Sequence, residues 1–122
     1  SEEKTKSRLE EFNELMAALK KSCKSSPETF DEIYNLIGKI LDNIIKSPEE
    51  EKFRTLNENN AKLKQTIFKF DSSKKIMELV GFRKKEGGSV SAETQTQHYN
   101  PLDVSNLKHI KMDIDIAYKN CL

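Results

Sequence analysis

The sequence is poor in the side chains that most covalent and metal chemistry requires. Its 122 residues include two cysteines, two histidines and no tryptophan. Cys23 and Cys121 are too far apart for a metal-ligand spacing and too few for a disulfide framework, so we expect a reducing compartment. Both thiols are expected to pack as small apolar groups. The sequence therefore predicts no metal and no cofactor.

The same scarcity argues against an enzyme. A nucleophilic cysteine needs a base beside it, but His98 falls in a polar stretch and His109 in the last predicted helix. No carboxylate pair stands in a glycine-rich or histidine-bearing setting that would shift its pKa. We therefore expect a chain without catalytic activity.

The chain also lacks an excess of charge of either sign and any long apolar run. With 21 basic and 20 acidic residues, its net charge of +1 provides little of the field that attracts a polyanion, which disfavours general nucleic-acid binding. No apolar stretch approaches the about 18 residues of a membrane span, and the charged start does not resemble a secretion signal. We expect a monomer in the cytoplasm or nucleus with no membrane contact.

What is present favours helices. Apolar residues make up 35% of the chain and charged residues 34%, with four glycines and three prolines, and the length predicts one helix-rich soluble domain. A narrow apolar stripe predicts a helix over residues 6–24, formed by Leu9, Phe12, Met16, Leu19 and Cys23. Because the stripe stops at Ser25-Ser26-Pro27, packing within the chain is favoured over a coiled coil.

Residues 26–46 form the predicted central core helix. Ser26 is a candidate N-cap and Pro27 suits the first helical position. The apolar face is wide and comprises Phe30, Ile33, Tyr34, Ile37, Ile40, Leu41, Ile44 and Ile45. Gly38 costs about 1 kcal/mol relative to alanine in such a helix, so we expect another element to approach closely there.

Shorter elements follow. Ser47-Pro48-Glu49-Glu50 predicts a short helix with a capping box, and residues 53–56 predict an extended piece. A further helix is expected from Asn59 or Asn60 to about Phe68–Phe70.

The last part of the chain carries two more predicted helices. Asp71-Ser72 is expected to cap the first, which Gly81 ends in a left-handed conformation with Phe82 packed back onto it. The run Arg83-Lys84-Lys85-Glu86-Gly87-Gly88 follows, and residues 89–97 then predict a mobile polar loop with strand-like ends. Asp103 is expected to cap a final helix that runs to about Asn120, with Val104, Leu107, Ile110, Ile114 and Ala117 inward.

Residues 43–54, Asn60 and the pair Gly81-Phe82 together resemble the signature of the PUB domain, also called the PUG domain. This family includes modules of peptide:N-glycanase, of UBX-containing adaptors and of the HOIP ubiquitin ligase. The resemblance implies a single α+β domain over residues 1–122, a predominantly helical bundle with a small antiparallel sheet and no catalytic activity. Its parts would be an N-terminal helix (1–25), core helices with the peptide-binding segment (26–82), a loop and strand region (83–101) and a C-terminal helix (102–122).

The resemblance also implies a partner. PUB domains typically bind the acidic C-terminal tail of the AAA ATPase valosin-containing protein, which ends in Leu-Tyr-Gly, and so link their parent proteins to ubiquitin–proteasome and ER-associated degradation. The positions that match the family are Asn43, Lys52, Asn60, Gly81 and Phe82. Phe53 replaces the usual tyrosine and Asn57 replaces the arginine of the glycanase module. Losing a charged hydrogen bond of roughly 1.5–3 kcal/mol would weaken a typical complex tenfold or more. The alternative is a PUB-like module that has lost ATPase binding and serves a structural role or binds other short peptides.

Physical reasoning leads to a similar site. A cleft that binds an acidic tail needs aromatic ring faces, carboxamides and cations. In this sequence Phe53 and Phe82 are the candidate rings, Asn57 is a candidate carboxamide, and Lys52 and Arg54 are candidate cations. Simpler interpretations remain open: the rings belong to the core, Asn59 or Asn60 caps a helix, and Arg83-Lys84-Lys85 is a solvated charge run. A third hypothesis uses those three cations with Lys52 and Arg54 to contact nucleic acid, which predicts a steep dependence on salt.

Overall fold

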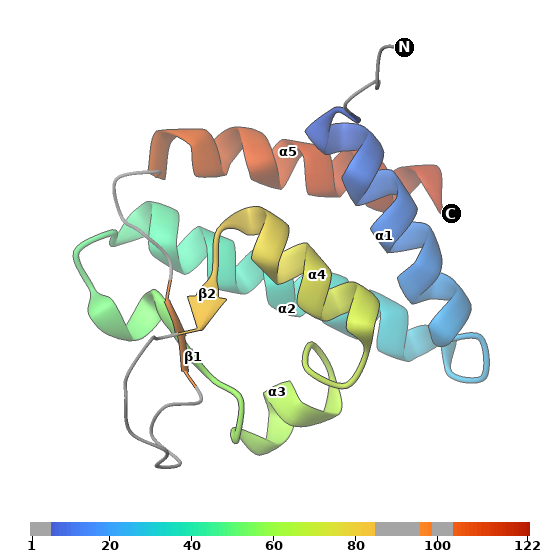
Figure 1. The fold of residues 1–122 in the computed structure, drawn as a ribbon, viewed down its shortest axis with the longest axis horizontal. Helices are drawn as coiled ribbons and strands as arrows, with labels where there is room; N and C mark the ends of the chain where they lie inside the picture. Colours follow the sequence, from blue (N-terminus) through green and yellow to red (C-terminus); the bar gives the residue numbers. More distant parts are fainter. Residues whose placement is uncertain (1–5, 85–95, 99–103) are drawn as a thin grey trace, which may run out of the picture.

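The computed structural model describes residues 6–84, 96–98 and 104–122, and it confirms a predominantly helical α+β fold with a small antiparallel sheet (Figure 1). The elements in chain order are α1 (Arg8–Ser22), α2 (Pro27–Lys46), the 3-10 helix η1 (Glu51–Phe53), β1 (Thr55–Asn57), α3 (Ala61–Gln65), α4 (Asp71–Val80), β2 (Arg83–Lys84), β3 (Thr96–His98) and α5 (Val104–Asn120). Helices α1 and α5 pack against each other, α1 also packs on α4, and α5 also packs on α2.

Helix α2 is a core helix, as its wide apolar face predicts. Its buried residues are Phe30, Ile33, Ile37, Leu41 and Ile44, and none is more than 3% exposed. Each such side chain contributes about 1.5–3 kcal/mol when fully removed from water. This face joins α2 to the same core cluster as the buried residues of α1, α4 and α5.

Helix α1 packs within the chain, as the narrow stripe predicts. Phe12, Met16, Leu19 and Cys23 are all buried in the common core. The helix starts with a capping box that the sequence reasoning missed, in which the Ser7 hydroxyl accepts from the Glu10 N–H and the Glu10 carboxylate accepts from the Ser7 N–H. The capping box fixes the first turn two residues later than the predicted start at residue 6.

Three predicted side-chain N-caps, at Ser26, Ser47 and Asp71-Ser72, are not formed. Ser26 occupies the N-cap position and Pro27 the first position of α2, as predicted, but the Ser26 hydroxyl contacts the Thr29 hydroxyl at 2.9 Å and caps no backbone N–H of the described residues. Ser47 ends α2 and cannot also begin a helix, so residues 47–50 form a turn and η1 starts at Glu51 without a side-chain cap. Helix α4 begins at Asp71 directly after Phe70, again without a side-chain cap.

The expected close approach to Gly38 is also wrong. A Cβ atom placed on Gly38 would meet no atom of the described residues within 4 Å. The glycine lies on the open side of α2 and lines a shallow depression between α2 and α5, together with Tyr34 and Lys111. The packing therefore does not require a glycine at this position.

The end of α4 is as predicted. Gly81 has φ of 129°, a left-handed conformation that glycine adopts without strain. The Phe82 N–H donates to the Met77 carbonyl at 3.0 Å, and the Phe82 side chain is fully buried. This is the hydrogen-bonding pattern of a helix C-cap followed by an apolar residue that packs back.

The sheet brings together two distant parts of the chain. The strand order is β1-β3-β2, with Thr55 and Arg83 both opposite His98. Strand β3 confirms the strand-like end predicted near residue 97, whereas β2 precedes the predicted loop. Adjacent strands are about 4.8 Å apart, which places Thr55 and Arg83 roughly 10 Å from each other across β3. The rest of that loop, with Lys85, and the predicted cap Asp103 lie outside the described residues.

The final helix α5 ends at Asn120 and buries Leu107, Ile110, Ile114 and Ala117 as predicted. Of Val104, only its place at the start of the helix is described. Within the described ranges, no helix is long and apolar enough to cross a membrane.

Candidate peptide-binding site

The candidate site begins where α2 ends. Asn43 lies in the last turn of α2 with an exposed side chain, and its carbonyl accepts the Ser47 N–H at 3.0 Å. The chain then turns through residues 47–50 into η1, which contacts both α2 and β1. This turn brings Lys52, Phe53 and Arg54 next to the end of α2.

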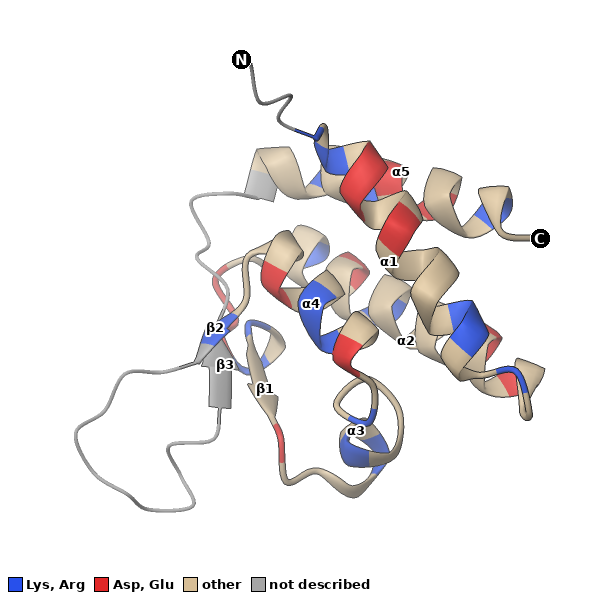
Figure 2. Ribbon diagram, turned by 45° about the vertical axis from the view of Figure 1, so that its right-hand side comes forward, with Lys and Arg blue, Asp and Glu red and all other residues tan. Residues whose placement is uncertain are grey.

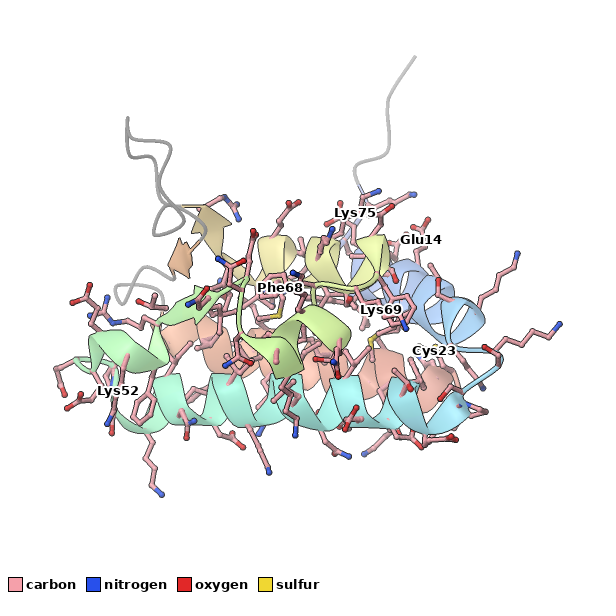
Figure 3. All side chains as sticks on the ribbon, turned by 90° about the horizontal axis from the view of Figure 1, so that it is seen from below. Glu14, Cys23, Lys52, Phe68, Lys69 and Lys75 are labelled. Atoms are coloured by element: carbon pink, nitrogen blue, oxygen red, sulfur yellow. The ribbon has the colours of Figure 1, made fainter. Side chains whose placement is uncertain are left out.

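Lys52 and Phe53 form a cation–π pair on η1. The Lys52 Nζ lies 5.2 Å from the centroid of the Phe53 ring, and Lys52 itself is exposed at one end of the molecule (Figure 3). The Phe53 ring is partly buried against the hydrophobic core, so part of it stays accessible. An accessible ring held by the core beside a cation suits an aromatic or aliphatic ligand with negative charge.

Arg54 follows directly and caps the C-terminal end of η1. Its side chain is partly buried, and its Nε is shielded from water yet has no hydrogen-bond partner among the described residues. A buried donor without an acceptor costs about 1–3 kcal/mol, more when the group is charged. The Arg54 side chain as a whole is only partly buried, so its positive charge is still available to an anionic ligand.

Asn57 and Asn60 shape the turn between β1 and α3. The Asn57 Oδ1 accepts the Asn59 N–H at 2.8 Å, and the Asn60 N–H donates to the Asn57 carbonyl at 3.0 Å. Asn60 is the N-cap of α3, where its Oδ1 accepts the N–H groups of Lys62 and Leu63 at 3.0 and 3.1 Å. Both amide oxygens are therefore used in the turn, and the NH₂ groups are what these exposed residues can offer a ligand.

Helix α3 is shorter than expected. It ends at Gln65, and the Phe68 N–H turns back to the Leu63 carbonyl at 2.8 Å instead of continuing the helix. The capping role of Asn60, one of the simpler interpretations, is confirmed.

Phe82 does not supply the expected second ring wall. Its side chain is 0% exposed and belongs to the core cluster. The physical reason is the helix C-cap at Gly81, which directs the next apolar side chain back onto α4. Of the two predicted rings, only Phe53 has surface that a ligand could reach in this structure.

Arg83 also has a local role. Its Nη1 donates to the carbonyls of Glu78 and Phe82 at 2.6 and 2.8 Å, so the guanidinium closes the C-terminal end of α4. A cation in this position is favoured by the partial negative charge of a helix C-terminus. These bonds compete with the phosphate contacts that the nucleic-acid hypothesis needs.

The structure thus brings together Asn43, Lys52, Phe53 and Arg54 at the α2–η1 junction. Asn57 and Asn60 follow through β1, whereas Gly81 and Phe82 reach the same region only through the sheet. Three exposed glutamates, Glu49 to Glu51, precede Lys52, so the local charge is mixed. Among the residues that the structure describes, no cluster of histidine, cysteine and acidic side chains could hold a metal ion.

Comparison with known proteins identifies the family. The PUB domain family model matches residues 27–112, from the first residue of α2 into α5, and this range includes every predicted site residue. No curated protein and no solved structure matches the chain. PUB domains are protein-interaction modules, not catalytic ones, and they bind partner peptides. Because the match covers well over half of the sequence, the chain belongs to the PUB domain family.

Proposed function

We propose that this domain binds the acidic, aromatic-containing C-terminal tail of the AAA ATPase valosin-containing protein. Through this contact it would link its parent protein to ubiquitin–proteasome and ER-associated degradation in the cytoplasm or nucleus. The observation that carries the proposal is the run Lys52-Phe53-Arg54, which combines an accessible ring, a cation beside it and a partly exposed guanidinium.

The chemistry of each group suits one part of such a tail. The tail's aromatic or leucine side chain packs on the exposed part of Phe53, and its carboxylates pair with Lys52 and Arg54. The NH₂ groups of Asn57 and Asn60 donate to peptide carbonyls. A short disordered segment loses conformational freedom on binding, so micromolar affinity is expected.

A titration followed by NMR tests the proposal. The ¹⁵N-labelled domain is mixed with an acidic peptide that ends in Leu-Tyr-Gly, and a peptide of the same composition in scrambled order serves as control. We expect the amide signals of Asn43, Phe53 and Asn60 to shift together with the first peptide only. If these signals stay fixed at millimolar peptide, the domain does not bind this tail.

A second candidate function is binding of a different short acidic peptide without the ATPase. It is favoured by the buried ring of Phe82 and by Asn57, which offers no fixed charge. The same titration distinguishes the two, because an acidic peptide that ends in another apolar residue would then shift the same signals at lower concentration than the Leu-Tyr-Gly peptide.

A further inference from the structure

A cavity of about 640 Å³ lies at the other end of α2. It is formed by the C-terminal half of α1, the turn into α2, the first turn of α2 and the end of α5. The apolar lining comprises Ala17, Cys23, Pro27, Phe30, Cys121 and Leu122. The volume is within the range of about 300–1,000 Å³ that is typical of ligand pockets.

The floor and the mouth of this cavity differ in exposure. Cys23 and Phe30 are each only 3% exposed and form a sealed apolar floor, whereas Leu122 at the mouth is 75% exposed. Burial raises the pKa of both the Cys23 and the Cys121 thiol, which favours their neutral form, so both contribute apolar surface to the cavity. A contiguous apolar hollow rimmed by polar residues is typical of a protein-interaction site or a ligand-binding groove.

Three lysines, Lys20, Lys21 and Lys24, line the same cavity. The Lys20 Nζ donates to the Cys121 carbonyl and so holds the end of α5. Lys21 and Lys24 are exposed, and no ion pair engages them within the described chain.

One of the described lining side chains is acidic, Asp31, and it accepts the Tyr118 hydroxyl at 2.6 Å. The net charge of the lining side chains is therefore positive, and it complements acidic side chains of a ligand.

The cavity is separate from the candidate peptide-binding site. A helix rises about 1.5 Å per residue, so Phe30 and Asn43 lie about 20 Å apart along α2. Figure 3 places Lys52 and Cys23 toward opposite ends of the molecule.

We propose that this cavity is a second docking site, for a segment of a partner protein with one large apolar side chain between acidic residues. The apolar side chain enters the cavity over Phe30, and the flanking carboxylates pair with Lys21 and Lys24. A hollow with a sealed floor suits a single inserted side chain better than a lipid surface, which favours a flat or protruding basic face.

Designed peptides test the proposal. The probes are nine-residue peptides with blocked ends, in which aspartate and glutamate flank a central Trp, Phe or Leu. We expect at least one of them to shift the ¹⁵N-domain amide signals of Ala17, Lys24, Phe30 and Cys121. Peptides with a central serine, or with lysine flanks, should leave these signals unchanged.

Charge reversal supplies a matched comparison. The double variant Lys21→Glu/Lys24→Glu should bind the best probe at least about fivefold more weakly, since each exposed ion pair contributes roughly 0.2–1 kcal/mol and repulsion replaces it. The control Lys64→Glu/Lys74→Glu changes the net charge equally at exposed positions outside the cavity, and should alter affinity less than twofold. Ala17→Trp, at an exposed lining position, should block binding while the amide spectrum stays folded.

Several outcomes would overturn the proposal. They are no shift with any probe at millimolar concentration, shifts confined to Asn43 and Phe53, and binding only to phosphatidylserine-containing vesicles that Lys21→Glu/Lys24→Glu abolishes. Because the two sites have different reporter residues, a failure here leaves the tail-binding proposal untouched, and the reverse also holds.

Discussion

At the scale of single residues, Arg54 shows what the structure adds to a site residue that the sequence already suggested. A family resemblance can point to an arginine, but only the folded chain shows that its Nε is buried without an acceptor among the described residues. Phe82 illustrates the opposite case. A lone aromatic has no periodic pattern that separates a core ring from a ligand-binding ring, so its full burial could not be predicted.

The Arg54→Met variant separates binding from stability. Methionine keeps the apolar stem that packs here and removes the charge and the unpaired donor. We expect tail-peptide affinity to fall about tenfold, from the loss of roughly 1.5 kcal/mol in charged hydrogen bonding, while the free energy of unfolding stays equal or rises. Calorimetric titration and urea unfolding measure the two quantities. A variant that is clearly destabilised would mean that Arg54 mainly supports the fold.

Two glycines should respond to alanine in opposite directions. At Gly38 a Cβ meets no atom of the described part of the chain within 4 Å, so Gly38→Ala should stabilise the domain by about 0.5–1 kcal/mol through helix propensity. At Gly81, where φ is 129°, Gly81→Ala should destabilise it by about 1–2 kcal/mol. Urea unfolding of both variants checks the signs. Destabilisation by Gly38→Ala would show that the depression beside α2 needs a glycine.

At the scale of elements, apolar periodicity was sufficient to predict that the long helices exist, but it was not sufficient to predict how they begin. Helices α1, α2 and α5 each bury a regular stripe, whose spacing is visible in the sequence. Caps depend on which local hydrogen bond is made, and Ser26 bonds to Thr29 in place of a backbone N–H. The sheet pairs Thr55 with His98, and nothing local in the sequence specifies so distant a partner.

Helices α2 and α5 are tied together by a reciprocal pair of hydrogen bonds. The Tyr34 hydroxyl of α2 donates to Asp115 of α5, and the Tyr118 hydroxyl of α5 donates to Asp31 of α2, both at 2.6 Å. The two tyrosine rings stack at 3.7 Å between centroids. The spacing of three residues between acid and tyrosine recurs in Asp31/Tyr34 and Asp115/Tyr118, a signal that sequence reasoning missed.

These hydrogen bonds should make the free energy of unfolding fall at alkaline pH. Burial and the Asp115 hydrogen bond raise the pKa of Tyr34 above its usual value near 10. The unfolded chain therefore releases the Tyr34 proton at a lower pH than the folded chain. The contribution of Tyr34 to the free energy of unfolding is complete below pH of about 10 and is lost as the pH rises further. Tyr34→Phe should lower stability by about 1.5–3 kcal/mol at pH 8, as expected for a hydrogen bond to a charged partner.

Urea unfolding at pH 8 and pH 10.5 measures this dependence. The difference between the native chain and Tyr34→Phe should shrink at the higher pH, because the variant has no hydroxyl to titrate at this position. A constant difference at both pH values would exclude Tyr34 as the source of the alkaline effect.

At the scale of the whole molecule, the small net charge conceals an uneven distribution. Residues 28–51 contain seven acidic and two basic side chains, and residues 62–84 contain seven basic and two acidic ones. Basic residues accordingly lie on α3 and α4 (Figure 2). Composition alone predicted little long-range field, but a domain with separated charges can still orient an acidic partner as it approaches.

The salt dependence of tail binding follows from this distribution and from the few cations at the candidate site. Ring burial on Phe53 is insensitive to salt, and only Lys52 and Arg54 pair with the tail, so affinity should fall a few fold between roughly 0.05 and 0.2 M salt. A nucleic-acid mode with 6–10 phosphate contacts would instead lose about 10³–10⁵-fold over the same range. Fluorescence anisotropy of a labelled tail peptide and of a labelled oligonucleotide measures both. Since Arg83 already bonds two carbonyls at the end of α4, we expect only the peptide to bind at the higher salt concentration, and an oligonucleotide that still bound there would favour the nucleic-acid hypothesis.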